Sequence, residues 1–198
     1  PKHAARLVHR ESCDIAAMLL TRLIAKRMHL IYEGTMTKTD RYKKLVRKLK
    51  QSGYAVHVIV VDVPLDLAKR RADQRAKITG RKIPHHVIET THRLVPKTLE
   101  CIKHQADSYR VYDNQRELTL IASNHYVEPD LYAKFLQKAG IKYRIAPTNL
   151  QPKMVSCPLP GRAVAIAKWI PHDRQKGTPP AHINDCDHDD VLDRVYPE

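Results

Sequence analysis

The sequence has no long hydrophobic run and only a few scattered cysteines. No stretch of about 18 consecutive apolar residues occurs, so the sequence predicts no transmembrane helix, and it shows no hydrophobic segment of a secretory signal. The cysteines Cys13, Cys101, Cys157 and Cys186 lie far apart and form no CxxC pair. In a chain of 198 residues this pattern excludes a disulfide framework and indicates a reducing compartment, the cytoplasm.

Glycine and large aromatic residues are also scarce. The chain holds six glycines, and its aromatic residues, 6% of the chain, are nine tyrosines, one tryptophan and one phenylalanine. No two glycines are five positions apart, so the sequence contains no GxxxxGK[ST] loop, whose backbone amides would cradle phosphate groups. The aromatic residues are scattered, whereas a stacking platform for single-stranded nucleic acid needs them clustered.

Acidic residues are scarce in the first part of the chain. Residues 1–114 hold 24 Lys and Arg against 11 Asp and Glu, a formal charge of +13, whereas the remaining residues hold 11 against 10. Such an excess attracts polyanions, which include nucleotides, nucleic acid and anionic membrane surfaces. The alternative is a basic surface that serves only solubility.

Helical and strand-like segments alternate along the first part of the chain. Apolar periodicity predicts helices over residues 11–28, 39–51, 64–77 and 84–104, the last of them kinked or split by Pro96. Short β-branched or apolar runs predict strands over residues 29–32, 54–63, 108–114 and 117–122. The alternation indicates an α/β fold, in which a parallel sheet is flanked by helices.

The character of the chain changes after Asn124. A helix over residues 128–139 and strands over 142–146 and 162–170 are predicted there, among many prolines. We therefore expect two regions: a domain over residues 1–124 and an uncharacterised Pro-rich C-terminal region, residues 125–198, forming an irregular appendage. The spacing of His182, Cys186 and His188 matches no standard zinc site, so no metal site is predicted.

One acid stands at the predicted end of a strand. Glu33 follows the apolar run HLIY, and Gly34 and Thr35 come next. Ligands bind at the carboxyl ends of the strands in open parallel sheets, and a carboxylate there can accept hydrogen bonds from a substrate hydroxyl or from metal-bound water. The alternative is an ordinary loop acid that caps the next helix.

Several arginines gather in the stretch RRADQRAKITGRKIP. Arg71 and Arg75 are four residues apart and share one helix face, and Arg81 follows the Gly80 break. Guanidinium groups on a helix and its loop suit a phosphoryl group in transfer, because they offer forked donors and a permanent charge. The alternative is a solvated face with salt bridges to nearby aspartates.

Five segments occur in the order and spacing of a known family: LVHRESCDIA, HLIYEGTM, GYAVHVIVVDVP, RRADQRAKITGRKIP and ADSYRVYDN. Over residues 6–115 the chain resembles the zeta toxin family of P-loop kinases. The resemblance implies a P-loop kinase fold and the use of ATP and Mg²⁺. It also implies transfer of a phosphoryl group to the 3′-hydroxyl of the amino sugar in UDP-N-acetylglucosamine, and an antitoxin protein as partner.

The resemblance also assigns roles to residues. Arg75 and Arg81 would be the catalytic arginines that close over the triphosphate. The substrate side would be lined by Glu33, Thr35, Ser12, Glu11 and His9. The nucleotide end would be formed by Arg71, Asp113 and Asn114.

The chain departs from the family pattern in one respect. The P-loop is missing, and the catalytic aspartate that follows it in the family would lie before Pro1. We therefore expect a partial P-loop kinase fold that does not phosphorylate efficiently as given. Two alternatives remain open: a polynucleotide 5′-hydroxyl kinase, and a non-catalytic relative that binds nucleic acid.

Overall fold

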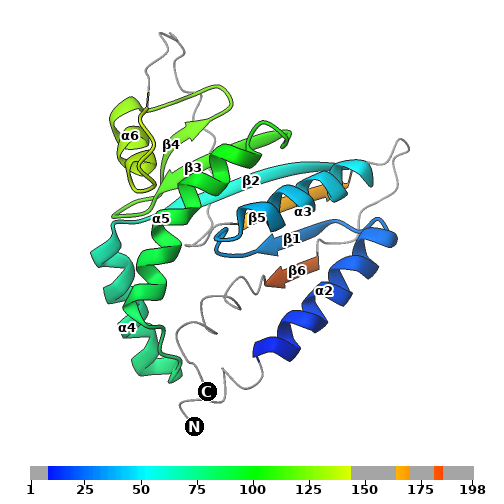
Figure 1. Cartoon of the computed structure of the whole chain (residues 1–198), viewed down its shortest axis with the longest axis horizontal. Coiled ribbons are helices and arrows are strands. Elements are labelled where there is room, and N and C mark those ends of the chain that lie inside the picture. Colours follow the sequence, from blue (N-terminus) through cyan, green and yellow to red (C-terminus); the bar gives the residue numbers. More distant parts are fainter. Residues whose placement is uncertain (1–8, 144–163, 170–180, 185–198) are drawn as a thin grey trace.

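The computed structural model describes residues 9–143, 164–169 and 181–184, with side chains described within residues 11–143. Helices and strands alternate along most of this length (Figure 1). The helices are α2 (His9–Ala25), α3 (Thr39–Gln51), α4 (Leu65–Thr79), α5 (His85–Ile102) and α6 (Pro129–Gln137). The strands are β1 (Leu30–Glu33), β2 (Tyr54–Asp62), β3 (Ser108–Asp113), β4 (Thr119–Ser123), β5 (Val164–Trp169) and β6 (Ala181–Asn184).

The strands form one mixed sheet in the order β4-β3-β2-β5-β1-β6. Strands β6, β1, β2 and β3 run parallel to one another, while β4 and β5 run against their neighbours. The predicted α/β class and the partial P-loop kinase-like fold are therefore confirmed. The prediction of a parallel sheet is correct for four strands, and the two antiparallel strands make the sheet mixed.

Strand β5 lies between β1 and β2 and pairs with both. Ala165 is opposite Tyr32 on one side and Val58 on the other. This strand lies within the predicted run 162–170, and β6 also comes from the region predicted as an irregular appendage. Both strands come from beyond Asn124 and belong to the same sheet as the strands before it. The division of the chain into two regions after Asn124 stays a prediction.

Two helical crossovers cover one face of the sheet. Helix α3 connects β1 to β2, and α4 and α5 connect β2 to β3, both moving in the same direction across the sheet. Right-handed connections then place α3 and α5 on the same face, where Figure 1 draws both in front of the strands. The hydroxyls of Thr39 and Thr98 are 2.8 Å apart and join the two helices. The fully buried side chains under them include Tyr42, Leu99, Ile102, Val56, Val58 and Val60.

Most predicted elements agree with the structure to within a few residues. Helix α3 has the predicted bounds, because its buried positions Tyr42, Val46 and Leu49 follow helical spacing. Of the predicted kink or split at Pro96, the split is wrong, because α5 is one helix with this buried proline inside it; the kink stays a prediction. Lys142 and Tyr143 lie in no strand, and the rest of the predicted strand 142–146 falls outside the described residues. Within the described part, no helix is long and apolar enough to cross a membrane.

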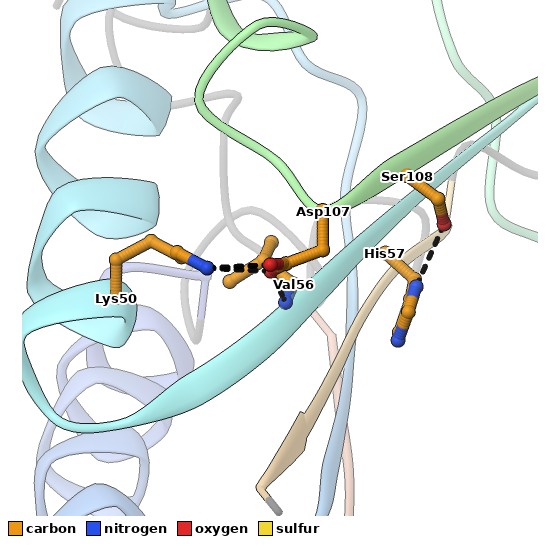
Figure 2. A network of polar contacts seen from close by, with 5 residues as sticks. All are labelled: Lys50, Val56, His57, Asp107 and Ser108. Carbon is orange, nitrogen blue, oxygen red and sulfur yellow. Dashed lines mark hydrogen bonds and ion pairs between the residues drawn. The ribbon is translucent and has the colours of Figure 1, made fainter. Parts of the chain in front are cut away.

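A polar network fastens α3 to the start of β3 at the edge of the sheet opposite the carboxyl strand ends (Figure 2). The carboxylate of Asp107 accepts from Lys50 Nζ at 2.6 Å and from the backbone N–H of Val56 at 2.7 Å. Nearby, His57 Nδ1 lies 2.7 Å from the hydroxyl of Ser108. Desolvation raises the pKa of Asp107, but the hydrogen bonds from Lys50 and Val56 outweigh it, so this pKa lies below its ordinary value.

This network makes stability depend on pH in a defined direction. Because the folded-state pKa of Asp107 is lowered, its stabilising effect is complete above the unfolded value of about 3.9 and is lost as the pH falls through the folded value. We expect Asp107→Ala to lower the free energy of unfolding by about 1 kcal/mol at pH 7, allowing for solvent screening. Urea unfolding at pH 7 and pH 3 should show the difference shrink at pH 3. A difference equal at both pH values, or one matched by the exposed control Asp130→Ala, contradicts the assignment.

Candidate functional site

The end of β1 places Glu33 at the carboxyl edge of the sheet. Glu33 is the last residue of the strand and is half-buried. Thr35 follows in the loop, and its hydroxyl lies 3.4 Å from that of Thr37. Met36, which is buried, adopts a φ of 56°, so the backbone turns sharply here before α3 begins. The loop that carries Thr35 therefore begins directly at the carboxyl end of β1, where ligands bind in open α/β sheets.

The end of β3 supplies the second part of this edge. Asp113 is the last residue of β3, and the N–H of Asn114 donates to the carbonyl of Asp62 at 2.8 Å. Arg71 Nη2 donates to the carbonyl of Asn114 at 3.0 Å. The structure therefore brings together the three residues predicted for the nucleotide end: Arg71, Asp113 and Asn114.

The other two predicted arginines lie at the far part of α4 and beyond it. Arg75 is on the helix and Arg81 in the loop after Gly80, which ends α4 with a φ of 72°. Both arginine side chains are exposed. Asp73, one of the aspartates in the alternative of a solvated basic face, contacts His85 at 3.0 Å.

The predicted substrate residues of the first segment lie at the start of α2. His9 is the first residue of the helix, and Glu11 and Ser12 follow in its first turn. The side chains of Glu11 and Ser12 are exposed. The buried residue of this turn is Cys13, which fixes the helix against the rest of the fold. In Figure 1, α4 hangs at the left where β2 ends, and α2 starts below the sheet and runs to the right.

Sequence reasoning missed a cluster of charged side chains at the end of β2. The carboxylate of Asp62 accepts from Lys138 Nζ, and Lys138 Nζ lies 3.1 Å from His92 Nε2. His92 Nε2 also lies 2.8 Å from the carbonyl oxygen of Val63. Asp62 could have been found by the strand-end reasoning that selected Glu33, since VVDV ends a buried strand in the same way. No local signal marks His92 and Lys138, which come from α5 and the end of α6.

The described residues give no place for a metal or for a complete triphosphate cradle. They contain no group of three or more His, Cys, Asp or Glu side chains that could hold a metal ion. The sequence contains no GxxxxGK[ST] loop, so the backbone amides that would hold a triphosphate and the hydroxyl that would bind Mg²⁺ are missing. The residues present therefore do not fit Mg²⁺–ATP by themselves. What they offer is a half-buried carboxylate, Glu33, at the end of β1, and exposed arginines on α4 and in the loop after it.

Comparison with known proteins gives one match. The family model described as zeta toxin matches residues 1–126, which contain α2 to α5 and β1 to β4. No curated protein matches the chain. No solved structure matches it either.

Proposed function

Because the chain belongs to the zeta toxin family, we propose that it carries the acceptor side of an ATP-dependent kinase site. The acceptor would be a hydroxyl of a nucleotide-sugar such as UDP-N-acetylglucosamine. The observation that carries the proposal is the position of Glu33, a half-buried carboxylate at the carboxyl end of β1. This is the edge at which open α/β sheets bind ligands.

Glu33 would accept a hydrogen bond from the acceptor hydroxyl and hold its oxygen toward the phosphoryl donor. Thr35 would add a hydroxyl from the loop above it. The residues at the start of α2 would contact the remaining hydroxyls of the sugar: His9, Glu11 and Ser12. Binding of this kind orients the acceptor, which is most of what a protein contributes to phosphoryl transfer.

The arginines would act on the donor side. Arg75 and Arg81 are exposed at the end of α4 and in the following loop, where their guanidinium groups can reach a developing phosphoryl charge. Arg71, held against Asn114, would border the nucleotide together with Asp113. Without a P-loop among its 198 residues, the chain would bind the acceptor but would not by itself transfer a phosphoryl group efficiently. We also propose an antitoxin protein as the partner of the chain, as in the family. The proposed location is the cytoplasm.

Replacement of Glu33 by glutamine tests the acceptor site. The change keeps the size of the side chain and removes the charge that accepts the hydroxyl hydrogen bond. We expect affinity for UDP-N-acetylglucosamine to fall about tenfold, since hydrogen bonds to charged groups contribute about 1.5–3 kcal/mol. Isothermal titration calorimetry of the purified chain at neutral pH measures this. UDP alone should bind equally to both proteins.

The matched control is Asp40→Asn, an exposed acid in the first turn of α3. It removes the same charge close to Glu33 in sequence but away from the strand end. No measurable binding of UDP-N-acetylglucosamine to the unaltered chain, or equal losses in both variants, contradicts the proposal. Binding of an oligonucleotide with a free 5′-hydroxyl that is lost only in Glu33→Gln would replace the nucleotide-sugar with a polynucleotide acceptor.

A further inference from the structure

The outer face of α3 carries a compact group of cations. Lys44, Arg47 and Lys48 are exposed and lie three and four residues apart, so they form one patch on the helix surface. The apolar face of the same helix is fully used, because Tyr42 and Leu49 are buried against the rest of the fold. We call these three residues, Lys44, Arg47 and Lys48, the α3 cationic patch.

Several other lysines of the fold form ion pairs with acids. Lys50, one turn further along α3, is bound to Asp107 at 2.6 Å. Lys69 contacts Glu89 at 2.6 Å, and Lys103 contacts Glu100 at 2.7 Å. Within the described part of the chain, no ion pair or hydrogen bond joins the α3 cationic patch to an acid. Its three charges therefore face solvent uncompensated, in the half of the sequence that carries a formal charge of +13.

The chemistry of the patch selects one class of polyanion. A single-stranded nucleic acid would need exposed aromatic rings for stacking, and the aromatic residue of α3, Tyr42, is 1% exposed. A membrane would be held more firmly if apolar side chains entered it beside the cations, and those of α3 are turned toward the sheet. A regular phosphate backbone needs neither feature, because it binds through charge alone.

The spacing of the patch also suits a duplex. Lys44 and Lys48 are separated by about 6 Å along the helix axis, at a rise of about 1.5 Å per residue. Successive phosphates on one strand of duplex DNA rise by about 3.4 Å along the duplex axis and are further apart in space, because the strand winds around that axis, so Lys44 and Lys48 can contact two successive phosphates. We propose that the α3 cationic patch is a docking surface for the phosphate backbone of double-stranded nucleic acid. This surface is separate from the carboxyl edge of the sheet and independent of the kinase proposal.

Salt-dependent binding to a 20-base-pair DNA duplex of arbitrary sequence tests the proposal. Three phosphate contacts predict that log K falls with log salt concentration with a slope of about −2.7, which is a roughly 40-fold loss of affinity between 50 and 200 mM salt. The triple variant Lys44→Gln, Arg47→Gln, Lys48→Gln should remove a slope of about that size. Fluorescence anisotropy with a labelled duplex measures both quantities for the full chain.

A second triple variant controls for loss of net charge. Arg93→Gln, Lys97→Gln and Lys134→Gln remove three exposed cations from α5 and α6 and should leave the slope nearly unchanged. Circular dichroism melting of both triple variants establishes that they are folded. Three results overturn the proposal: no duplex binding at 50 mM salt, equal losses in the two triple variants, or patch-dependent binding to phosphatidylserine vesicles without duplex binding.

Discussion

Replacing Ile166 with proline is expected to lower the free energy of unfolding by about 3 kcal/mol. Ile166 lies in the middle of β5, opposite Ile31 on one side and His57 on the other. Proline has no N–H to donate, and its ring does not fit the interior of a sheet. The substitution therefore removes a ladder hydrogen bond and leaves a carbonyl of a neighbouring strand without its donor, at a cost of about 1–3 kcal/mol for the unsatisfied group alone.

Urea unfolding followed by circular dichroism measures this effect. The control is Ile166→Val, which keeps the N–H and removes one methylene, for an expected loss of no more than about 1.5 kcal/mol. If the proline variant is as stable as the valine variant, β5 does not occupy the space between β1 and β2 in solution.

The result bears on how the family fold is completed in this chain. The family model ends at residue 126, so β5 comes from outside the matched part and still lies between two strands of the matched part. An antiparallel strand is more usual at the edge of an otherwise parallel sheet than inside it. Without β5, the facing edges of β1 and β2 would present unpaired backbone groups. The C-terminal region thus has a structural role that its composition did not suggest.

Local pattern was sufficient to predict most elements, although not β6 (Ala181–Asn184), and insufficient to predict their arrangement. The run 54–63 is nearly all apolar, and it forms β2, which is paired on both sides. The pattern of 162–170 predicted a strand just as well. Its partner strands are set by pairing across more than 100 residues, and nothing in the run itself encodes them. Pro96 shows the opposite limit, because burial against the core keeps α5 continuous where local preference favours a break.

The candidate site was predictable where an acidic residue directly follows or ends a predicted strand. Glu33 ends β1, as the strand-end rule predicted, and Asp113, which the family resemblance assigned to the nucleotide end, ends β3. The contact of Arg71 with Asn114 spans 43 residues, and it was grouped correctly only through the family resemblance. The cluster of Asp62, His92 and Lys138 could not be assembled from sequence, because three elements converge on it. Its energetic weight can be measured directly.

Replacing Asp62 with alanine is expected to lower the free energy of unfolding by about 2–3 kcal/mol. The side chains of Asp62 and Lys138 are each 18% exposed, so removal of the carboxylate leaves a largely buried ammonium group without its counter-charge. His92 cannot replace the Asp62 carboxylate as a partner of Lys138. His92 Nε2 lies 2.8 Å from the carbonyl oxygen of Val63. Because a carbonyl oxygen only accepts hydrogen bonds, this contact places the proton on Nε2. A protonated Nε2 has no lone pair left to accept a hydrogen bond from Lys138.

A pair of comparisons separates this loss from a general effect of removing an acid. Asp73 contacts His85, and both side chains are more than 40% exposed, at 44% and 47%; Asp73→Ala should therefore cost no more than about 1 kcal/mol. In a Lys138→Met background, Asp62→Ala should cost at least about 1 kcal/mol less than in the unaltered chain, because the charge that it strands is gone. Equal costs in the two backgrounds would show that the loss does not come from the pairing of Asp62 with Lys138 and would contradict this assignment, since the backbone contact with Asn114 is kept in the alanine variant.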